Sequence, residues 1–327
     1  MRHRSELVKA SMPFAREIVS RSWANLCATL LALGAVTFLT LLPLPWYASI
    51  PISILMGLVL VRMFVMYHDY QHGVILNRSP LARLIMNTFG VVTLTPPSIW
   101  NRSHNYHHKH NSKTFGSDIG SFPIMTTEAY AKATPFEKWK YRTARHPITI
   151  LLGYLTIFAF GMCLRPLINR PKDHLDSAYS LAIHLSILVC LGIYAPEIMW
   201  KTVVIPMAVA CSVGSYIFYA QHNFPAAKIK SRGEWDPVFA ALNSSSYMKM
   251  NKVMHWFTAN IGYHHIHHLN SRIPFYRLPE AMEAMKELQS PGRTSLAPVE
   301  IYRCLRLKLW DPNLDRFVTF KESRLVA

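Results

Sequence analysis

Acidic residues and paired cysteines are scarce in this chain, and each scarcity argues against a class of protein. The 327 residues include 18 Asp and Glu against 35 Lys and Arg, which gives a formal net charge of +17. The five cysteines are scattered and form no C-x-x-C pair. This pattern favours small buried side chains with free thiols over a disulfide framework. No H-E-x-x-H motif is present, which argues against an intramembrane zinc protease.

Hydrophobic residues, by contrast, are abundant and clumped. They make up 51% of the chain, which is too apolar for an ordinary soluble domain. Runs of bilayer length are predicted to cross a membrane as helices. These predicted transmembrane helices are residues 22–44, 46–67, 178–194 and 203–219. Two further runs, residues 81–95 and 148–164, are predicted to lie along the membrane interface without crossing it.

The basic residues set the predicted orientation. The tail before the first run contains Arg16 and Arg21, whereas the loop 42–51 has no charge. Likewise, basic residues follow the run 148–164, but the loop 195–200 has no Lys or Arg. This is the positive-inside pattern, which favours membrane anchoring over nucleic-acid binding as the reason for the net charge. It places both termini in the cytoplasm. The first run is longer than a signal-peptide core and lacks an A-x-A-like site, so no cleavable signal is expected.

The predicted fold is therefore an all-α integral membrane protein, a single domain over residues 1–327 with four transmembrane helices and interfacial helices. A cytoplasmic helical cap is expected over residues 225–327, with amphipathic helices near 278–289 and 298–309. Arg62 interrupts the second run, and arginine is costly in hydrocarbon, so it is expected at the cytoplasmic interface. The helix would then project into the cytoplasm.

Three histidine clusters follow the apolar runs. Helix positions i, i+3 and i+4 lie on one face, so each cluster can present two or three ring nitrogens together. The clusters comprise His68 and His72; His104, His107 and His108; and His264, His267 and His268. His222, three residues beyond the last apolar run, is a ninth candidate ligand. Such placement just past apolar helices predicts a di-metal site at the membrane surface.

The number of imidazoles bears on the kind of metal site. Eight or nine exceed the four ligands of one tetrahedral zinc and suit two metals with open positions. Imidazole binds iron, zinc, copper or nickel, so ligand type alone does not select the metal. Asp69 and Asp118 are expected to orient imidazoles by accepting their free N–H, although each suits a cap or turn equally well.

The remaining histidines receive weaker predictions. His184, inside an apolar run, is expected to make a hydrogen bond within the bundle. His110 and His265 neighbour the ligand candidates and either support them or have no role at the site. The others are expected to be incidental: His3, His146, His174 and His255.

The clusters and their flanks resemble the membrane fatty acid desaturase family, acyl-lipid type. The resemblance rests on the stretch Ser103–Asn111, on Gln221-His222, and on the stretch Gly262–Leu278 with its I-P-F-Y-R-L ending. It spans roughly residues 67–278. The three boxes together are specific for the superfamily, but alkane hydroxylases and carotenoid hydroxylases and ketolases carry similar boxes.

The resemblance implies an oxidoreductase that introduces a cis double bond into a membrane-lipid acyl chain, using dioxygen and two electrons. The implied cofactor is a non-haem diiron centre held by the nine histidines. No H-P-G-G haem-binding motif is present, so a separate ferredoxin or cytochrome is expected to supply the electrons. The basic cytoplasmic face would steer such an acidic donor, although the same charges could instead bind anionic lipid.

Two other functions stay open at this point. A diiron hydroxylase or ketolase acting on alkanes or carotenoids is the main alternative. A membrane metal transporter is a distant one, because transporters place ligands near the bilayer midplane and these clusters flank the spans.

Overall fold

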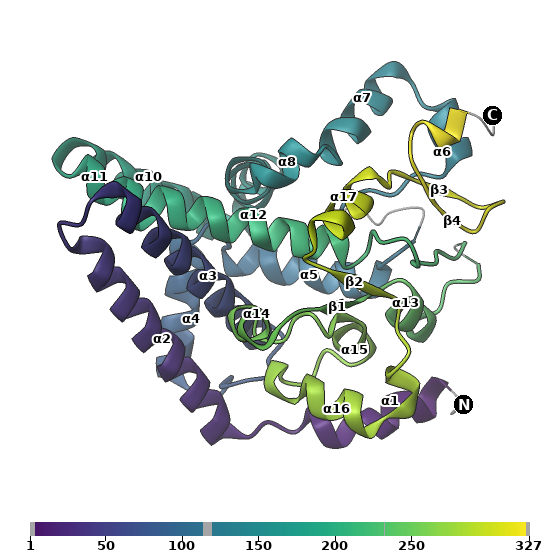
Figure 1. Cartoon of the computed structure of the whole chain (residues 1–327), viewed down its shortest axis with the longest axis horizontal. Coiled ribbons are helices and arrows are strands. Elements are labelled where there is room, and N and C mark those ends of the chain that lie inside the picture. The colour runs from purple at the N-terminus through teal and green to yellow at the C-terminus, as the bar shows by residue number, and fades with distance from the viewer. Residues whose placement is uncertain (1–3, 114–119, 232, 325–327) are drawn as a thin grey trace.

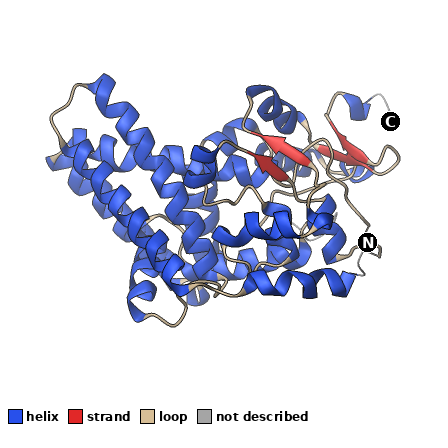
Figure 2. Cartoon of the chain, turned by 60° about the horizontal axis from the view of Figure 1, so that its bottom comes forward, coloured by secondary structure: helices blue, strands red, loops and turns tan. Residues whose placement is uncertain are grey.

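The computed structural model describes residues 4–113, 120–231 and 233–324. Long helices form a bundle at one end of the molecule, and short helices with small strand pairs form a cap at the other (Figures 1 and 2). Both ends of the chain lie on the cap side. The prediction of a mainly helical membrane protein is confirmed.

Four helical segments are long and apolar enough to cross a membrane. They are α2 (Val19–Leu41), α3 (Trp46–Gln71), α10 (Leu175–Tyr194) and the segment Pro196–Ala220, which comprises α11 (Pro196–Met199), η4 (Trp200–Val204) and α12 (Ile205–Ala220). These match the four predicted crossings, although the last begins earlier than expected. The turn between α2 and α3 contains Pro43 and Pro45, which cannot donate to a helical ladder.

The central member of the bundle is α3. Within the most apolar window of each helix, 56% of the residues are buried in α3, against 22% in α2 and 17% in α10. The outer helices therefore leave most of their apolar surface to lipid. Against α12, α3 packs closely at Gly57, where a Cβ atom would lie 2.7 Å from the Cβ of Val209. Any larger residue would push these two helices apart.

The two shorter apolar stretches are also helical. They form α4 (Pro80–Val92) and the segment Tyr154–Asn169, which comprises η2 (Tyr154–Leu164) and α9 (Arg165–Asn169) and is preceded by α8 (Pro147–Leu151). Neither α4 nor the segment Tyr154–Asn169 is among the four helical segments that are long enough to cross. That they lie along the interface stays a prediction.

Several shorter helices, most of them polar, lie outside the four spans. They are α1 (Arg4–Ser11), η1 (Met12–Ala15), α5 (Pro97–His110), α6 (Thr127–Lys132), α7 (Pro135–Ala144) and η3 (Pro171–Asp173). Proline is the first residue of α5 and of α7, where its missing N–H costs nothing. A capping box between Thr134 and Glu137 begins α7.

The rest of the cap combines short helices with two strand pairs. Its helices are α13 (Pro237–Asn243), α14 (Lys252–Phe257), α15 (His264–Leu269), η5 (Phe275–Arg277), α16 (Leu278–Ala284), η6 (Lys286–Leu288), α17 (Pro298–Arg306) and η7 (Glu322–Arg324). The expected amphipathic helices correspond to α16 with η6 and to α17. The strands, which were not predicted from the sequence, are β1 (Tyr247–Lys249), β2 (Arg293–Ser295), β3 (Leu309–Asp311) and β4 (Arg316–Val318).

The strand pairing fixes the middle of the cap. β1 and β2 pair in parallel with Tyr247 opposite Arg293, and β3 and β4 pair antiparallel. Just before β1, the N–H of Ser246 donates to the carbonyl oxygen of Gln221 at 3.0 Å, and its own carbonyl oxygen accepts from the N–H of His265 at 3.3 Å. The segment 244–249 therefore ties the end of α12 to α15.

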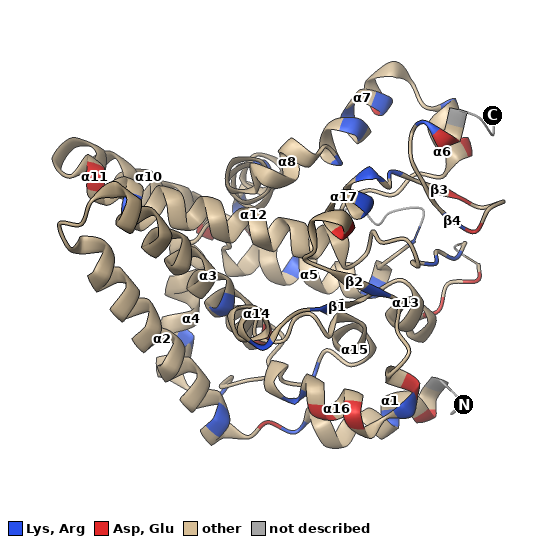
Figure 3. Ribbon diagram, viewed as in Figure 1, with Lys and Arg blue, Asp and Glu red and all other residues tan. Residues whose placement is uncertain are grey.

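Charged residues are concentrated on the cap and the short helices, whereas the long helices carry few (Figure 3). Arg62 of α3 is an exception and is only 3% exposed. Its guanidinium donates to Thr29 Oγ1 at 2.9 Å, Asn25 Oδ1 at 2.7 Å and the carbonyl oxygen of Trp256 at 2.5 Å. It also lies 4.3 Å from the centroid of the Trp256 ring. Arg62 thus joins two spans to α14 of the cap.

We expect Arg62→Met to lower the free energy of unfolding by about 2 kcal/mol or more, because it strands buried acceptors that a charged donor now satisfies. Thermal unfolding of detergent-purified protein measures this. Arg83→Met, at an exposed position of α4, is the matched control and should unfold like the wild type. Equal melting temperatures for the two variants would contradict the role assigned to Arg62.

Candidate metal centre

Three helices and one turn bring nine histidine side chains to a single place beneath the cap. The first cluster ends α3, the second lies on α5, the third lies on α15, and His222 follows α12 in a turn. Residues separated by up to 200 positions in the chain therefore meet. The turn of His222 is held by Gln221, whose Nε2 donates to the carbonyl oxygen of Ile261 at 2.8 Å.

The nine rings form two adjacent groups, and within each group the possible ligand atoms lie within 4.8 Å of one another. The first group is His68, His72, His104, His108 and His267. The second group is His107, His222, His264 and His268. All nine candidate ligands are brought together; that they bind metal stays a prediction.

The histidine clusters on α5 and on α15 each contribute to both groups. On each helix the i, i+4 pair shares one group and the i+3 residue belongs to the other. His104 and His108 are in the first group and His107 is in the second, whereas His264 and His268 are in the second and His267 is in the first. Because α5 and α15 each serve both groups, their packing sets the separation of the two groups.

Ring nitrogens of neighbouring histidines converge closely. The Nε2–Nε2 distances are between 2.9 and 3.2 Å for the pairs 104–108, 108–267, 107–268, 222–264 and 264–268. Two imidazoles bound at right angles to one metal, with bonds of about 2.1 Å, have nitrogens roughly 3 Å apart. The observed spacing is therefore that of adjacent ligands on one ion.

Contacts of the opposite ring nitrogens bear on the protonation state of individual rings. The Nδ1 of His222 lies 3.1 Å from the carbonyl oxygen of Ser244, and the Nδ1 of His68 lies 3.0 Å from Asp69 Oδ1. A backbone carbonyl oxygen only accepts hydrogen bonds, so the Nδ1 of His222 carries the proton and its Nε2 presents a bare lone pair. Converging lone pairs repel unless a cation lies among them. The donor set thus fits a bound metal ion.

Of the two predicted supporting carboxylates, Asp69 lies at the site. Its Oδ1 accepts from His68, and its Oδ2 accepts from the N–H of Phe275 at 2.8 Å. The carboxylate therefore connects the first box to the segment that follows the third. Asp118 lies outside the described residues. Ser121, whose Oγ is 2.5 Å from the Nδ1 of His107, was not among the predicted residues, because a lone serine has no distinctive pattern.

Aromatic residues separate the first group from an apolar cavity. The Trp100 ring stacks on His104 with centroids 4.8 Å apart, and Phe64 meets Trp100 edge-on at 5.0 Å. Phe64 lies one helical turn before His68 on α3. The cavity behind it is lined by Leu60, Val61, Phe64, Phe89, Thr93, Phe158, Met207, Ala210, Cys211 and Gly214. Apolar space among the membrane helices thus approaches the histidines.

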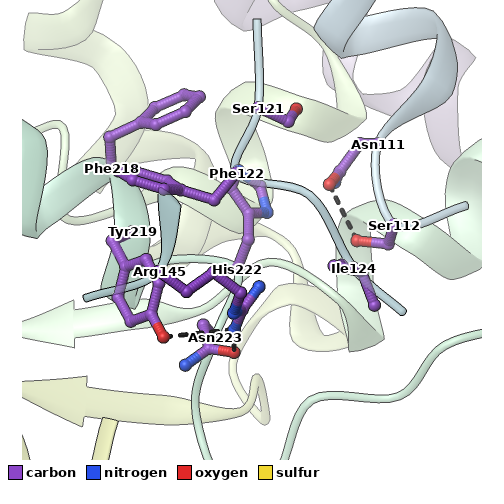
Figure 4. Close-up of a pocket in the computed structure, with 10 residues that line it drawn as sticks. All are labelled: Asn111, Ser112, Ser121, Phe122, Ile124, Arg145, Phe218, Tyr219, His222 and Asn223. Carbon is purple, nitrogen blue, oxygen red and sulfur yellow. Dashed lines mark hydrogen bonds between the residues drawn. The ribbon is translucent and has the colours of Figure 1, made fainter. Parts of the chain in front are cut away.

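A second cavity, drawn in Figure 4, adjoins the second group on the cap side. His222 and Ser121 are among its lining residues, together with Asn111, Arg145 and Asn223. Its lining is therefore more polar than that of the first cavity. It borders His222, which belongs to the second group, and Ser121, which contacts His107 of that group.

The other histidines that the structure describes belong to neither group. His184 bonds to the Tyr154 hydroxyl and lies 3.1 Å from the carbonyl oxygen of Val92, as the prediction of a bond within the bundle requires. The Nε2 of His265 faces the carbonyl oxygen of Leu288 at 3.0 Å. His174, expected to be incidental, is buried, and its Nδ1 lies 2.7 Å from the hydroxyl of Ser98 on α5.

The electrostatic environment keeps the rings neutral. Burial, reinforced by the charge of neighbouring rings, holds the pKa of six imidazoles well below the usual range: His104, His107, His108, His264, His267 and His268. Burial also lowers the pKa of His222 from 6.5 to about 4. Neutral imidazole is the form that binds metals, so the site is prepared for ligation at neutral pH.

Comparison with known proteins gives an independent finding. The family model for fatty acid desaturases matches residues 44–297. The chain is 28% identical to a fatty acid desaturase of Bacillus subtilis over 97% of its own length and 90% of that protein. It is 24% identical to an sn-1 oleoyl-lipid 12-desaturase of Synechocystis over 83% of its length and 78% of that protein. It is also 26% identical to an endoplasmic reticulum omega-3 fatty acid desaturase of Vigna radiata, over 90% and 78% respectively.

We expect metal-free protein to lose stability as the pH falls from 6.5 towards 4. The unfolded chain takes up protons on its histidines in this window, while the folded site with its lowered pKa values does not. Each such ring removes up to about 1.4 kcal/mol per pH unit. Melting temperatures of chelator-treated protein at pH 7.5, 6 and 5 measure the effect, and a flat profile would contradict it.

Proposed function

We propose, on the premise that this chain belongs to the fatty acid desaturase family, that it introduces a cis double bond into an acyl chain at a non-haem diiron centre. The chain is an oxidoreductase of that family with four membrane-spanning helices. The observation that carries the finer proposal is the convergence of nine neutral imidazoles into two adjacent groups beside apolar space.

The two histidine groups are the proposed ligand sets for two iron ions. The first would hold one ion through five imidazoles and the second would hold the other through four. Ligands of one type in adjacent groups suit a dinuclear centre, and imidazole is a good ligand for iron. Two iron ions bound here would supply, together with dioxygen, the oxidising power needed to break unactivated C–H bonds.

The protein would bind and shield the acyl chain. We propose that the chain enters from the bilayer along the apolar cavity behind Phe64 and passes Trp100 to reach the first group. Buried histidines and this aromatic wall exclude water from the reacting carbons. Overall, each turnover takes two hydrogen atoms from adjacent methylenes, two external electrons, two protons and one dioxygen. The products are one double bond and two water molecules.

A membrane-lipid acyl group is the favoured substrate. One of the relatives is named as acting on oleoyl groups of a lipid. The approach of the apolar cavity from among the membrane helices fits a substrate that stays in the bilayer. A hydroxylase or ketolase on the same scaffold is the second candidate, because the same ligand set can insert oxygen rather than remove hydrogen.

The proposed orientation places the metal centre and both termini in the cytoplasm. Arg16 precedes α2 and Arg21 lies in its first turn, while Arg165, Arg170 and Lys172 precede α10, which is the positive-inside pattern. A separate ferredoxin or cytochrome would then deliver electrons from that side, attracted by the excess of basic residues.

Cysteine labelling tests this orientation. In a cysteine-free background, we expect Leu44→Cys, in the α2–α3 turn, to react with an impermeant maleimide from outside intact cells. Ser231→Cys, in the cap, should react only after permeabilisation. Labelling of both positions from the same side would overturn the proposed topology.

Product analysis tests the reaction. Expression in a host that lacks its own desaturase should yield acyl chains lighter by two hydrogens, with the double bond in the cis configuration. Acyl chains heavier by one oxygen would instead identify a hydroxylase. Comparing lipid-bound, thioester-bound and free acyl pools after a short labelling pulse shows which acyl carrier is desaturated first.

Variants of single histidines test the ligand assignment. We expect His107→Ala or His267→Ala to lower turnover by at least a factor of 100, because each removes a ligand of one group. Insertion into the membrane should be unchanged. His110→Ala is the matched control, since that ring stacks on Tyr106 on the same helix and belongs to neither group. Full activity in either ligand variant would contradict the assignment.

A further inference from the structure

Arg145 is a fully buried side chain that the proposed chemistry does not use. It directly follows α7, is 1% exposed, and lines the cavity that adjoins His222 (Figure 4). Among the described residues, its guanidinium donates only to neutral oxygens, namely hydroxyl, side-chain amide and backbone carbonyl oxygens. A buried charge that pairs with no carboxylate in this part of the chain is costly, so its geometry calls for an explanation.

One side of the guanidinium holds the turn that carries His222. Its Nη2 donates to the side-chain oxygen of Asn223 and to the hydroxyl of Tyr219 at 3.1 Å. These residues stand one position after and three positions before His222. The guanidinium also lies 5.1 Å from the centroid of the Tyr219 ring. Arg145 therefore fixes the backbone on both sides of one candidate ligand.

The other side holds the segment that supports His107. Its Nη1 donates to the carbonyl oxygen of Pro123 at 2.7 Å. Two residues earlier, Ser121 contacts the Nδ1 of His107. Between them, the Phe122 ring packs edge-on against Tyr219 with centroids 4.9 Å apart. His107 and His222 belong to the same group, and their ring centroids are 4.8 Å apart.

The Arg145 side chain also joins the turn of His222 and the segment that supports His107 to the C-terminal part of the cap. Asn223 Nδ2 donates to the carbonyl oxygens of Cys304 at 2.7 Å and Leu307 at 3.1 Å. Arg145 also donates to Leu307 at 3.3 Å, and Lys308 Nζ donates to the carbonyl oxygen of Arg145 at 2.5 Å. The segment 304–308 thus closes a network around the second group.

We propose that Arg145 is the positioning residue of the second histidine group, through which the C-terminal segment 304–308 holds His107 and His222 in place for one of the two metal ions. The inference rests on the proposed metal function. A planar guanidinium can reach several acceptors in fixed directions, whereas an ammonium group cannot. Arg145 makes no hydrogen bond to a histidine of the first group, nor to a residue adjacent in sequence to such a histidine. We therefore expect the second group to depend on Arg145 more than the first group does.

The test is the iron content of purified, iron-loaded protein. We expect Arg145→Met to hold about one iron per chain where the wild type holds two, one for each group. The remaining ion should give the half-integer-spin paramagnetic resonance signal of an isolated ferric ion, which a coupled pair does not show. Arg142→Met is the matched control, because Arg142 lies on α7 three residues before Arg145, is exposed, and contacts Tyr130 rather than the second group.

Arg145→Lys separates geometry from charge. It should also hold one ion, because the lysine keeps the charge but loses the planar fork; two ions in this variant would overturn the geometric role. Two ions in Arg145→Met would overturn the inference altogether, as would loss of both ions from a folded variant.

A second variant tests the positioning role of Arg145 if Arg145→Met fails to accumulate. Asn223→Ala removes the acceptor beside His222 and keeps Arg145. We expect titration of metal-free Asn223→Ala with ferrous ion to show at least a tenfold weaker second binding step and an unchanged first step. An unchanged second step would overturn the inference. Failure of the wild type to bind iron would refute the proposed function itself, and so is distinguishable from failure of the inference.

Discussion

The convergence of nine buried imidazoles, with Nε2–Nε2 distances of 2.9 to 3.2 Å, forms a donor set that fits bound metal, and the rest of the structure depends on bringing these rings together. To stay neutral, the rings must be shielded from water, yet they stand at the ends of α3 and α12, beyond the part of the bundle that faces lipid. The cap provides this shielding. It covers the ends of the helices, and its helix α15 adds three candidate ligands to those of α3, α5 and the turn after α12.

Holding the rings requires partners from distant parts of the chain. Asp69 orients His68 and at the same time receives the N–H of Phe275, so one carboxylate fixes both α3 and the segment after α15. The carbonyl oxygen of Ser244 orients His222 from the strand segment of the cap. Each contact closes a long loop in the chain, which means that the site forms only when the cap and the bundle pack together.

The two sides of the centre differ in character. Towards the bilayer, Phe64 and Trp100 separate the first group from apolar space among the helices. Towards the cap, the second group adjoins a more polar cavity with a buried guanidinium. An acyl chain is suited to the first side. The second side is built from hydrogen bonds that fix backbone positions. The proposed reaction needs an apolar path for the substrate and rigidly held ligands. Membership in the fatty acid desaturase family agrees with this difference between the two sides of the centre.

The sequence by itself determined the four spans, the helical hairpin and the candidate ligands, because apolar runs and histidine spacing are local patterns that do not depend on tertiary contacts. Asp69 was also accessible, since it adjoins a histidine. The strand pairs, the assignment of His107 and His108 to different groups, and the contacts of Ser121 and Arg145 were not. Each depends on segments more than ten residues apart meeting at a defined angle, and the packing of α3, α5, α12 and α15 alone decides that.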